Sequence, residues 1–131
     1  MFSPQIRVLI IDDSAIARNS LSRILQTDPE IEVVGTAPDA LIGLKKIAEC
    51  SPDVLTLDVE MPKMDGLTFL ERLMSSRPMP VVMVSAYTSE GSETALRALD
   101  LGALEIIEKP SIDVSSGCLL YTSPSPRDQR G

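Results

Sequence analysis

Short apolar runs alternate with longer segments of helical periodicity along most of this chain. The apolar runs occupy residues 6–11 (IRVLII), 31–34 (IEVV), 54–57 (VLTL), 81–84 (VVMV) and 103–107 (ALEII). The first run is nearly continuously apolar, which is typical of a strand that is covered on both faces. The other four runs are short and mostly β-branched, so the pattern predicts five short strands.

The segments between the expected strands carry apolar residues three or four positions apart. Such residues share one face of a helix, which predicts an amphipathic helix in each segment. The shared faces consist of Ala17, Leu21, Ile24 and Leu25; of Leu41, Leu44 and Ala48; of Leu67, Leu70 and Met74; and of Ala95 and Leu99. Glycines and prolines separate these segments from the strands.

Strands that alternate with helices predict an α/β fold. The expected architecture is a doubly wound, five-stranded parallel sheet with helices on both faces. The strands are parallel because each helix carries the chain back to the end of the sheet at which the previous strand began. In such folds the ligand site lies outside the carboxyl ends of the strands. The residues that follow each strand are therefore the candidates for a functional site.

Polar residues with reactive or charged groups follow four of the five expected strands. Asp12 and Asp13 follow the first strand, Asp58 the third, Ser85 the fourth and Lys109 the fifth. Because the carboxyl ends of parallel strands lie at the same edge of a sheet, we expect these side chains to lie close together.

Three neighbouring carboxylates repel one another unless a cation joins them. Oxygen ligands that leave part of the coordination shell open suit Mg²⁺. A carboxylate between a metal ion and a lysine can act as a nucleophile toward phosphorus and form an acyl phosphate. We assign that role to Asp58, which ends the central strand, and we expect Asp12 and Asp13 to bind the metal.

Each of these residues also has a local structural interpretation. Asp13 or Ser14 could cap the following helix, and Asp65-Gly66 is more typical of a helix start than of a binding site. Taken singly, Ser85 is a loop serine and Lys109 a surface lysine. Their joint placement at successive strand ends is what favours a site.

Composition limits the classes of function. The chain has 131 residues, enough for one domain, and a net charge of −7. It has no histidine, which excludes a Ser-His-Asp triad and a histidine-ligated zinc site on this chain. The acidic charge and the 3% aromatic content disfavour nucleic-acid binding. No apolar run approaches the length of a membrane span and no signal peptide is evident, so we expect a cytoplasmic protein.

The pattern resembles the receiver domain of bacterial two-component response regulators. The matching residues are Asp12-Asp13, Asp58 within LDVEMPKMDG, Ser85 and Lys109-Pro110. The segments DVEMPKMDGLTFLERLM and RPMPVVMVSAYTSEGSETALRALDLGA further resemble the N-terminal receiver of chemotaxis protein-glutamate methylesterases. This resemblance implies a flavodoxin-like sheet with strand order 2-1-3-4-5 and a signalling role in chemotaxis.

The resemblance also implies a phosphoryl-transfer site. Asp58 would accept a phosphoryl group from a chemotaxis histidine kinase. Asp13 and Asp58 would bind Mg²⁺ directly, Asp12 would act mainly through water, and Glu60 would offer its backbone carbonyl.

Two further residues have roles implied by the resemblance. Ser85 would turn toward the phosphoryl group and transmit the signal to the following helix. Lys109 would pair with a phosphoryl oxygen, and the Lys109-Pro110 bond is often cis in such proteins.

Three features depart from the resemblance. The methylesterase half is not encoded here, so this chain is expected to be a non-enzymatic fragment whose natural partner would be its own missing catalytic domain. Ile106 stands where the family usually has an aromatic residue. The fifth helix is expected to be missing or replaced, because residues 111–131 (SIDVSSGCLLYTSPSPRDQRG) lack helical periodicity.

The expected organisation is a receiver domain over residues 1–110, followed by residues 111–131 as the start of a linker and a non-native, disordered tail. Three alternatives to a methylesterase receiver remain. One is a standalone receiver that acts by binding partners. Another is a Mg²⁺-dependent phosphohydrolase with an aspartyl-phosphate intermediate, for which Glu60 has the spacing of a general acid. A third, a flavin-binding module, is disfavoured because Asp12-Asp13 would repel a phosphate.

Overall fold

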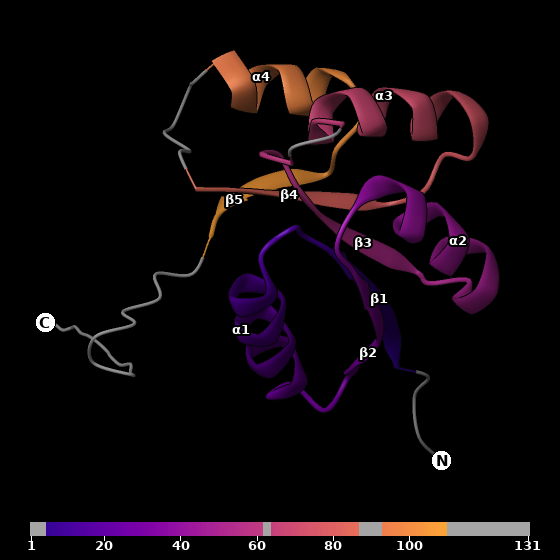
Figure 1. Ribbon diagram of the computed structural model, residues 1–131, viewed down its shortest axis with the longest axis vertical. Coiled ribbons are helices and arrows are strands. Elements are labelled where there is room, and N and C mark those ends of the chain that lie inside the picture. The colour runs from indigo at the N-terminus through magenta and orange to yellow at the C-terminus, as the bar shows by residue number, and fades with distance from the viewer. Residues whose placement is uncertain (1–4, 62–63, 87–92, 110–131) are drawn as a thin grey trace, which may run out of the picture.

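The computed structural model describes residues 5–61, 64–86 and 93–109, which form alternating strands and helices (Figure 1). In chain order the elements are β1 (Ile6–Ile11), α1 (Ala15–Gln26), β2 (Ile31–Ala37), α2 (Ala40–Cys50), β3 (Val54–Asp58), α3 (Gly66–Ser76), β4 (Val81–Ser85), α4 (Glu93–Asp100) and β5 (Glu105–Glu108). All five predicted strands are confirmed. The first begins and ends as predicted, whereas the second continues to Ala37.

The last strand begins at Glu105 rather than at the predicted Ala103. The backbone N–H of Ala103 donates to the carbonyl of Ala98 and so closes the end of α4. Gly102 precedes it with a φ of +114°, a left-handed conformation that glycine adopts without strain. The chain therefore turns through residues 102–103 before it joins the sheet.

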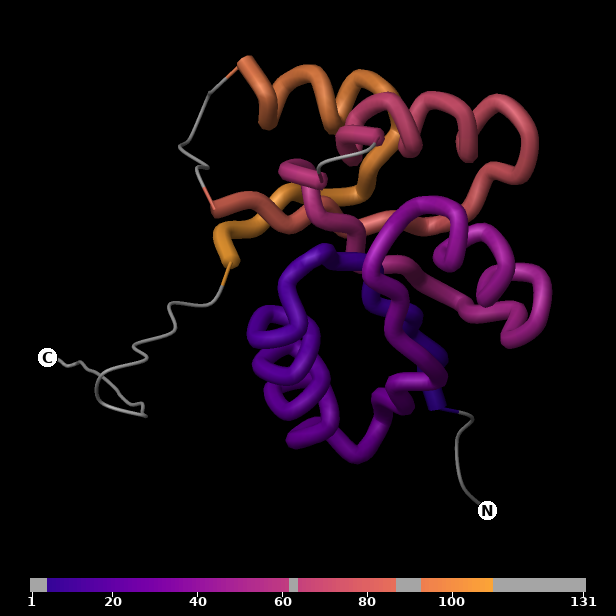
Figure 2. The backbone as a smooth tube through the Cα atoms, viewed as in Figure 1, coloured from indigo at the N-terminus to yellow at the C-terminus, as the bar shows by residue number. Residues whose placement is uncertain are grey.

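The strands form one parallel sheet in the order β2-β1-β3-β4-β5, which confirms the doubly wound, flavodoxin-like fold. Figure 2 shows the backbone with α1 on one face of the sheet and α2, α3 and α4 on the other. Both faces of the central strands are therefore covered, which explains their continuous apolar runs.

Two hydrophobic clusters hold these layers together. The larger one packs side chains of α2, α3 and α4 against the sheet around Leu9, Leu55, Leu57 and Met83. The smaller one packs Leu21 of α1 against β1 on the opposite face. The sheet is thus the central layer, and its carboxyl edge is a rigid platform for the residues that follow each strand.

The predicted core-facing side of α2 is wrong. Leu41 is 74% exposed and Leu44 is 47% exposed, whereas Ala40, Gly43 and Ile47 are buried. A Cβ at Gly43 would lie 2.7 Å from Cδ1 of Ile11, so α2 approaches the sheet too closely for a larger side chain at this position. Small residues set this distance, and the leucines turn outward.

The apolar face predicted for α4 also differs from the buried one, and the face predicted for α1 differs in part. Ala95 is buried as predicted, but Leu99 is 43% exposed and Ala98 takes its place against the sheet. In α1 the prediction holds for Ala17 and Leu21, whereas Ile24 is half exposed.

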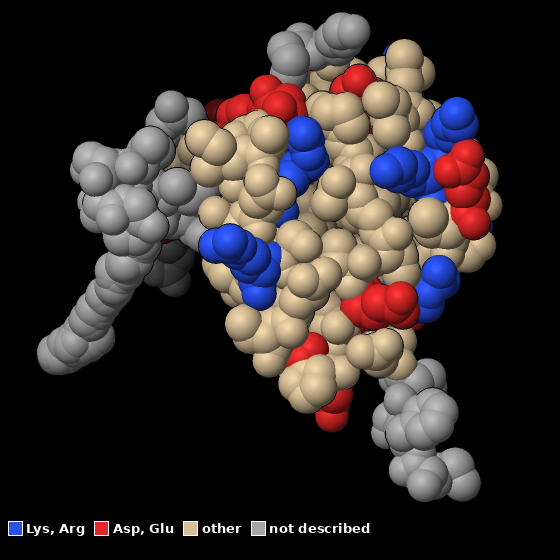
Figure 3. All heavy atoms as spheres, turned by 60° about the horizontal axis from the view of Figure 1, so that its bottom comes forward, with Lys and Arg blue, Asp and Glu red and all other residues tan. Residues whose placement is uncertain are grey.

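The surface seen in Figure 3 carries its Lys and Arg side chains in separate groups, divided by acidic and uncharged residues. Within the described ranges, no helix combines the length and apolar character that a membrane span requires. The predictions about a missing fifth helix, the tail and the Lys109-Pro110 bond fall on residues 110–131, outside the described residues.

Candidate functional site

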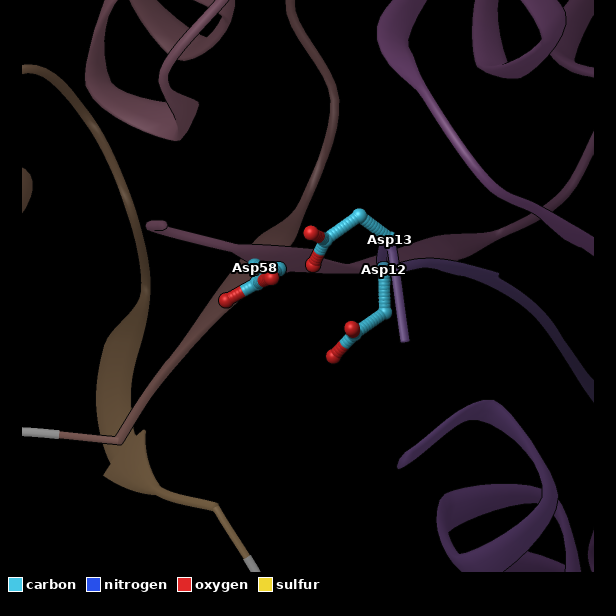
Figure 4. A group of neighbouring side chains, drawn as sticks. All are labelled: Asp12, Asp13 and Asp58. Atoms are coloured by element: carbon cyan, nitrogen blue, oxygen red, sulfur yellow. The ribbon is translucent and has the colours of Figure 1, made fainter. Parts of the chain in front are cut away.

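Three carboxylates meet at the carboxyl ends of β1 and β3. Asp12 and Asp13 follow β1 directly, and Asp58 is the last residue of β3. One carboxylate oxygen from each lies within 4.8 Å of the other two (Figure 4). Asp12 and Asp58 are each 1% exposed, whereas Asp13 is exposed to solvent. The sequence prediction that these residues converge is therefore correct.

Lys109, which follows β5, reaches across the edge of the sheet to two of these carboxylates. Its Nζ lies 3.3 Å from Oδ2 of Asp12 and 3.3 Å from Oδ2 of Asp58. The interpretation of Lys109 as an ordinary surface lysine is thus wrong. Its ammonium group bridges two buried acids that come from different strands.

The electrostatics of the site follow from burial and crowding. Burial, together with the negative charge of Asp12, raises the pKa of Asp58 from 3.8 to about 7, and the Lys109 ammonium offsets this only in part. Burial lowers the pKa of Lys109, but the charges of Asp12 and Asp58 outweigh burial and raise the pKa above 10.5. Lys109 therefore stays charged at neutral pH, whereas the pKa of Asp58 lies close to neutral pH.

Local hydrogen bonds hold the loop after β1 in place. Ser14 caps α1 by accepting a hydrogen bond from the N–H of Ala17, as one of the local interpretations predicted. The N–H of Ser14 donates to Oδ1 of Asp12 over 2.8 Å. The guanidinium of Arg18 donates to the backbone carbonyl of Asp12 over 2.7 Å. No motif in the sequence pointed to this contribution of Arg18.

The start of α3 packs directly against the end of β3. Asp65 caps α3 by accepting a hydrogen bond from the N–H of Thr68, which confirms its local interpretation. The N–H of Gly66 donates to the carbonyl of Val59 over 2.8 Å. A Cβ at Gly66 would lie 2.8 Å from Cα of Val59 and would also meet the carbonyl of Asp58. Glycine at this position therefore permits the close approach that fixes the Asp58 backbone.

Ser85 ends β4 beside the carboxylates and is 1% exposed. Its hydroxyl donates to Oε2 of Glu60 over 2.7 Å. The carboxylate of Glu60 also accepts a hydrogen bond from the N–H of Ala86 over 3.1 Å. The resemblance implied a role for the backbone carbonyl of Glu60 but not this side-chain contact. The contact could have been expected only from the strand order, because Glu60 follows β3 and Ser85 ends the neighbouring strand β4.

The residues present fit a divalent cation. Oδ2 of Asp12 and Oδ2 of Asp58 are buried, and within the described part of the chain they have the ion pairs with Lys109 but accept no hydrogen bond that meets the usual geometry. Three carboxylates face the site, and Lys109 offsets part of their charge. Hard oxygen ligands with a net negative charge are what Mg²⁺ and similar cations prefer. The exposed side of Asp13 adjoins an open depression that is also lined by Glu60 and Thr94.

Residues 8–115 match the family described as "Response regulator receiver domain". The protein-glutamate methylesterase/protein-glutamine glutaminase of Methylobacillus flagellatus is 58% identical over 117 residues, which cover 89% of this chain and 33% of that protein. The chain thus spans about a third of the length of the curated relatives it matches.

Solved structures agree with this assignment. The response regulator domain of Thermotoga maritima CheB superposes with a TM-score of 0.76 at 43% identity, covering 81% of this chain and 79% of that one. A chain from the crystal structure of the P1 domain of CheA3 in complex with CheY6 from R. sphaeroides superposes with a TM-score of 0.72 at 34% identity. The match covers 88% of this chain and 90% of that one. This chain therefore belongs to the response regulator receiver domains, and it is a receiver of the chemotaxis methylesterase type.

Proposed function

We propose that this chain is a phosphorylation-controlled switch that accepts a phosphoryl group on Asp58 from a chemotaxis histidine kinase. The observation that carries the proposal is the position of Asp58, whose buried carboxylate lies within 4.8 Å of a carboxylate oxygen of Asp13 and 3.3 Å from the ammonium of Lys109. The complex of CheY6 with the P1 domain of CheA3 supports a CheA-type donor, because it pairs a related receiver with that domain.

The proposed reaction transfers one phosphoryl group. An Oδ atom of Asp58 attacks phosphorus, the bond between phosphorus and the donor's histidine nitrogen breaks, and that nitrogen keeps the electron pair. The product is an acyl phosphate on Asp58. The leaving imidazole is neutral if its other nitrogen carries a proton, so no proton from this chain is required.

The side chains around Asp58 would each contribute charge or orientation. Asp12, Asp13 and Asp58, with the backbone carbonyl of Glu60, would hold Mg²⁺, which when bound supplies positive charge to the phosphoryl oxygens. Lys109 lies 3.3 Å from Asp58 and would pair with a phosphoryl oxygen. Ser85 would donate its hydroxyl hydrogen to another, as the family resemblance implies. Asp58 must be deprotonated to attack, which cation binding and Lys109 both favour.

The biological output would come from a longer protein that contains this receiver. We propose that residues 1–110 form the receiver and that residues 111–131 begin a linker followed by a non-native tail. In a longer parent protein, phosphorylation would control a methylesterase domain. The added charge would alter the surface around α4 and so release or reposition that domain.

Intact-mass spectrometry after incubation with Mg²⁺ and acetyl phosphate tests the phosphoacceptor. The wild-type chain should gain the mass of one phosphoryl group, and Asp58→Asn should gain none. Asp100→Asn, which removes the same charge from an exposed position at the end of α4, should be phosphorylated like the wild type. Continuous release of phosphate without an adduct would instead support the phosphohydrolase, and an adduct that persists in Asp58→Asn would overturn the assignment.

A further inference from the structure

The side chain of Glu60 spans the gap between the loop after β3 and the end of β4. One carboxylate oxygen accepts the hydroxyl hydrogen of Ser85 over 2.7 Å, and the other accepts the N–H of Ala86 over 3.1 Å. Glu60 itself is exposed, whereas Ser85 is buried. A solvent-exposed acid thus holds a buried hydroxyl at the edge of the phosphoryl-transfer site.

The hydrogen bond to Glu60 uses the hydroxyl hydrogen that Ser85 would have to donate to a phosphoryl group on Asp58. A serine hydroxyl carries one hydrogen and can donate it to one acceptor at a time at full strength. A short bond to an ionised carboxylate is among the stronger hydrogen bonds in proteins. If Ser85 is to donate to a phosphoryl oxygen on Asp58, its bond to Glu60 must break.

We propose that the Glu60 side chain is a positioning residue that competes with the phosphoryl group for Ser85. It holds Ser85 and Ala86 in the resting arrangement, and so weakens the binding of phosphoryl-like groups at Asp58. This inference rests on the proposed phosphorylation of Asp58, and it assigns Glu60 a role distinct from its backbone carbonyl.

Phosphorylation itself would favour the exchange. A phosphoryl group adds about 1.5 to 2 negative charges and new acceptor oxygens close to the Glu60 carboxylate. Repulsion between the two anions weakens the resting contact as the new acceptor becomes available. Release of Ser85 and Ala86 would then free the end of β4, from which the chain continues toward α4.

The test uses beryllium fluoride, a non-covalent analogue of the phosphoryl group, added with saturating Mg²⁺ to the full 131-residue chain. Isothermal titration calorimetry measures its affinity for the wild type, Glu60→Ala, Glu60→Gln, Ser85→Ala and the double variant Glu60→Ala/Ser85→Ala. We expect Glu60→Ala to bind beryllium fluoride about tenfold more tightly than the wild type, since a charge-assisted hydrogen bond no longer has to break.

The other variants separate competition for Ser85 from simple charge repulsion. Glu60→Gln removes the same charge but keeps an acceptor for Ser85, so its affinity should lie between those of the wild type and Glu60→Ala. In the Ser85→Ala background, Glu60→Ala should give a clearly smaller gain, because only the repulsion between the two anions remains to be removed. An equal gain with and without Ser85, or equal affinities of Glu60→Ala and Glu60→Gln, would overturn the proposal in favour of repulsion.

A purely structural role for Glu60 predicts a different result. In that case Glu60→Ala would lower the unfolding temperature without tightening beryllium fluoride binding, which would also overturn the proposal. Affinity for Mg²⁺ alone should change little, because every variant keeps the backbone carbonyl of residue 60. Beryllium fluoride binding that survives Asp58→Asn would instead refute the proposed phosphoacceptor, so the two failures are distinguishable.

Discussion

The ammonium nitrogen of Lys109 lies 3.3 Å from Oδ2 of Asp58, although β4 separates the strands that carry the two residues. The same nitrogen lies 3.3 Å from Oδ2 of Asp12, a residue 97 positions earlier in the chain. One cation therefore joins the ends of β1, β3 and β5. We expect this link to contribute both to the stability of the fold and to the charge balance of the site.

Replacing Lys109 by Met should lower both the stability of the fold and the yield of phosphorylation. Two buried carboxylates would lose their shared counter-charge, so we expect a loss of about 2 kcal/mol in the free energy of unfolding at pH 8. The yield of phosphorylated protein should fall at least tenfold at a fixed reaction time, because Lys109 would no longer offset charge on the phosphoryl oxygens. Urea unfolding and intact-mass spectrometry measure the two effects.

Lys45→Met, at an exposed position on α2, is the matched control for this experiment. It removes the same charge and should leave the free energy of unfolding within about 0.5 kcal/mol of the wild type. Equal stability of Lys109→Met and Lys45→Met would show that the bridge contributes nothing measurable.

Without a divalent cation, Asp58 should make stability fall as pH rises from about 4 to about 7. In the folded state the pKa of Asp58 is about 7, against 3.8 for an ordinary carboxyl group, so the folded chain holds a proton that the unfolded chain has released. Linkage then removes up to about 4 kcal/mol across this window. Urea unfolding in EDTA at a series of pH values measures the difference between the wild type and Asp58→Asn.

Asp58→Asn should lack this contribution and should be more stable than the wild type at pH 8. Asp100→Asn should keep the pH dependence of the wild type, because its side chain is exposed. Parallel stability curves for the wild type and Asp58→Asn would contradict the raised pKa.

Mg²⁺ should raise the unfolding temperature of the wild type, and Asp13→Asn should greatly reduce this effect. A ligand that binds only the folded state stabilises it in proportion to the logarithm of its concentration. Because Asp13 is exposed, its replacement should barely change the unfolding temperature without metal, yet it should weaken Mg²⁺ binding at least tenfold. Thermal unfolding monitored by circular dichroism, with and without Mg²⁺, measures the unfolding temperatures of the two proteins. An undiminished response to Mg²⁺ in Asp13→Asn would remove this residue from the metal site.

Gly66→Ala should destabilise the fold by about 2 kcal/mol and reduce phosphorylation. Its Cβ would lie 2.8 Å from Cα of Val59, so the backbone at the start of α3 or after Asp58 must shift. Gly35→Ala is the control, since a Cβ there would meet a flexible tip, Cδ1 of Leu9, at 3.4 Å. The control should stay within about 1 kcal/mol of the wild type in urea unfolding. Similar losses in both variants would mean that the contact between α3 and Asp58 is not special.

The strands and the site residues could be predicted from the sequence because short apolar runs alternate with segments of helical periodicity. These runs marked the strands, although β5 is largely exposed, and the residues after parallel strands had to meet at one edge of the sheet. Asp12, Asp13, Asp58, Ser85 and Lys109 all lie at that edge. Local propensity added Ser14 and Asp65 as helix caps.

The orientation of α2 could not be predicted in the same way, because both of its faces contain apolar residues. Leu41 and Leu44 are the more hydrophobic choice for the core, but Ala40 and Gly43 occupy it. The distance between helix and sheet decides between the two faces, and no periodicity in the sequence encodes that distance.

By itself, then, the sequence determined the order of strands and helices, the parallel sheet and the set of acidic and basic groups at its carboxyl edge. Alternation and strand ends are local properties, so they can be read without knowing how the chain packs. The tertiary structure decided that Lys109 bridges Asp12 and Asp58, and that Glu60 holds Ser85. Those contacts depend on distances of a few ångströms between separate strands, and such distances arise only when the sheet and its helices pack together.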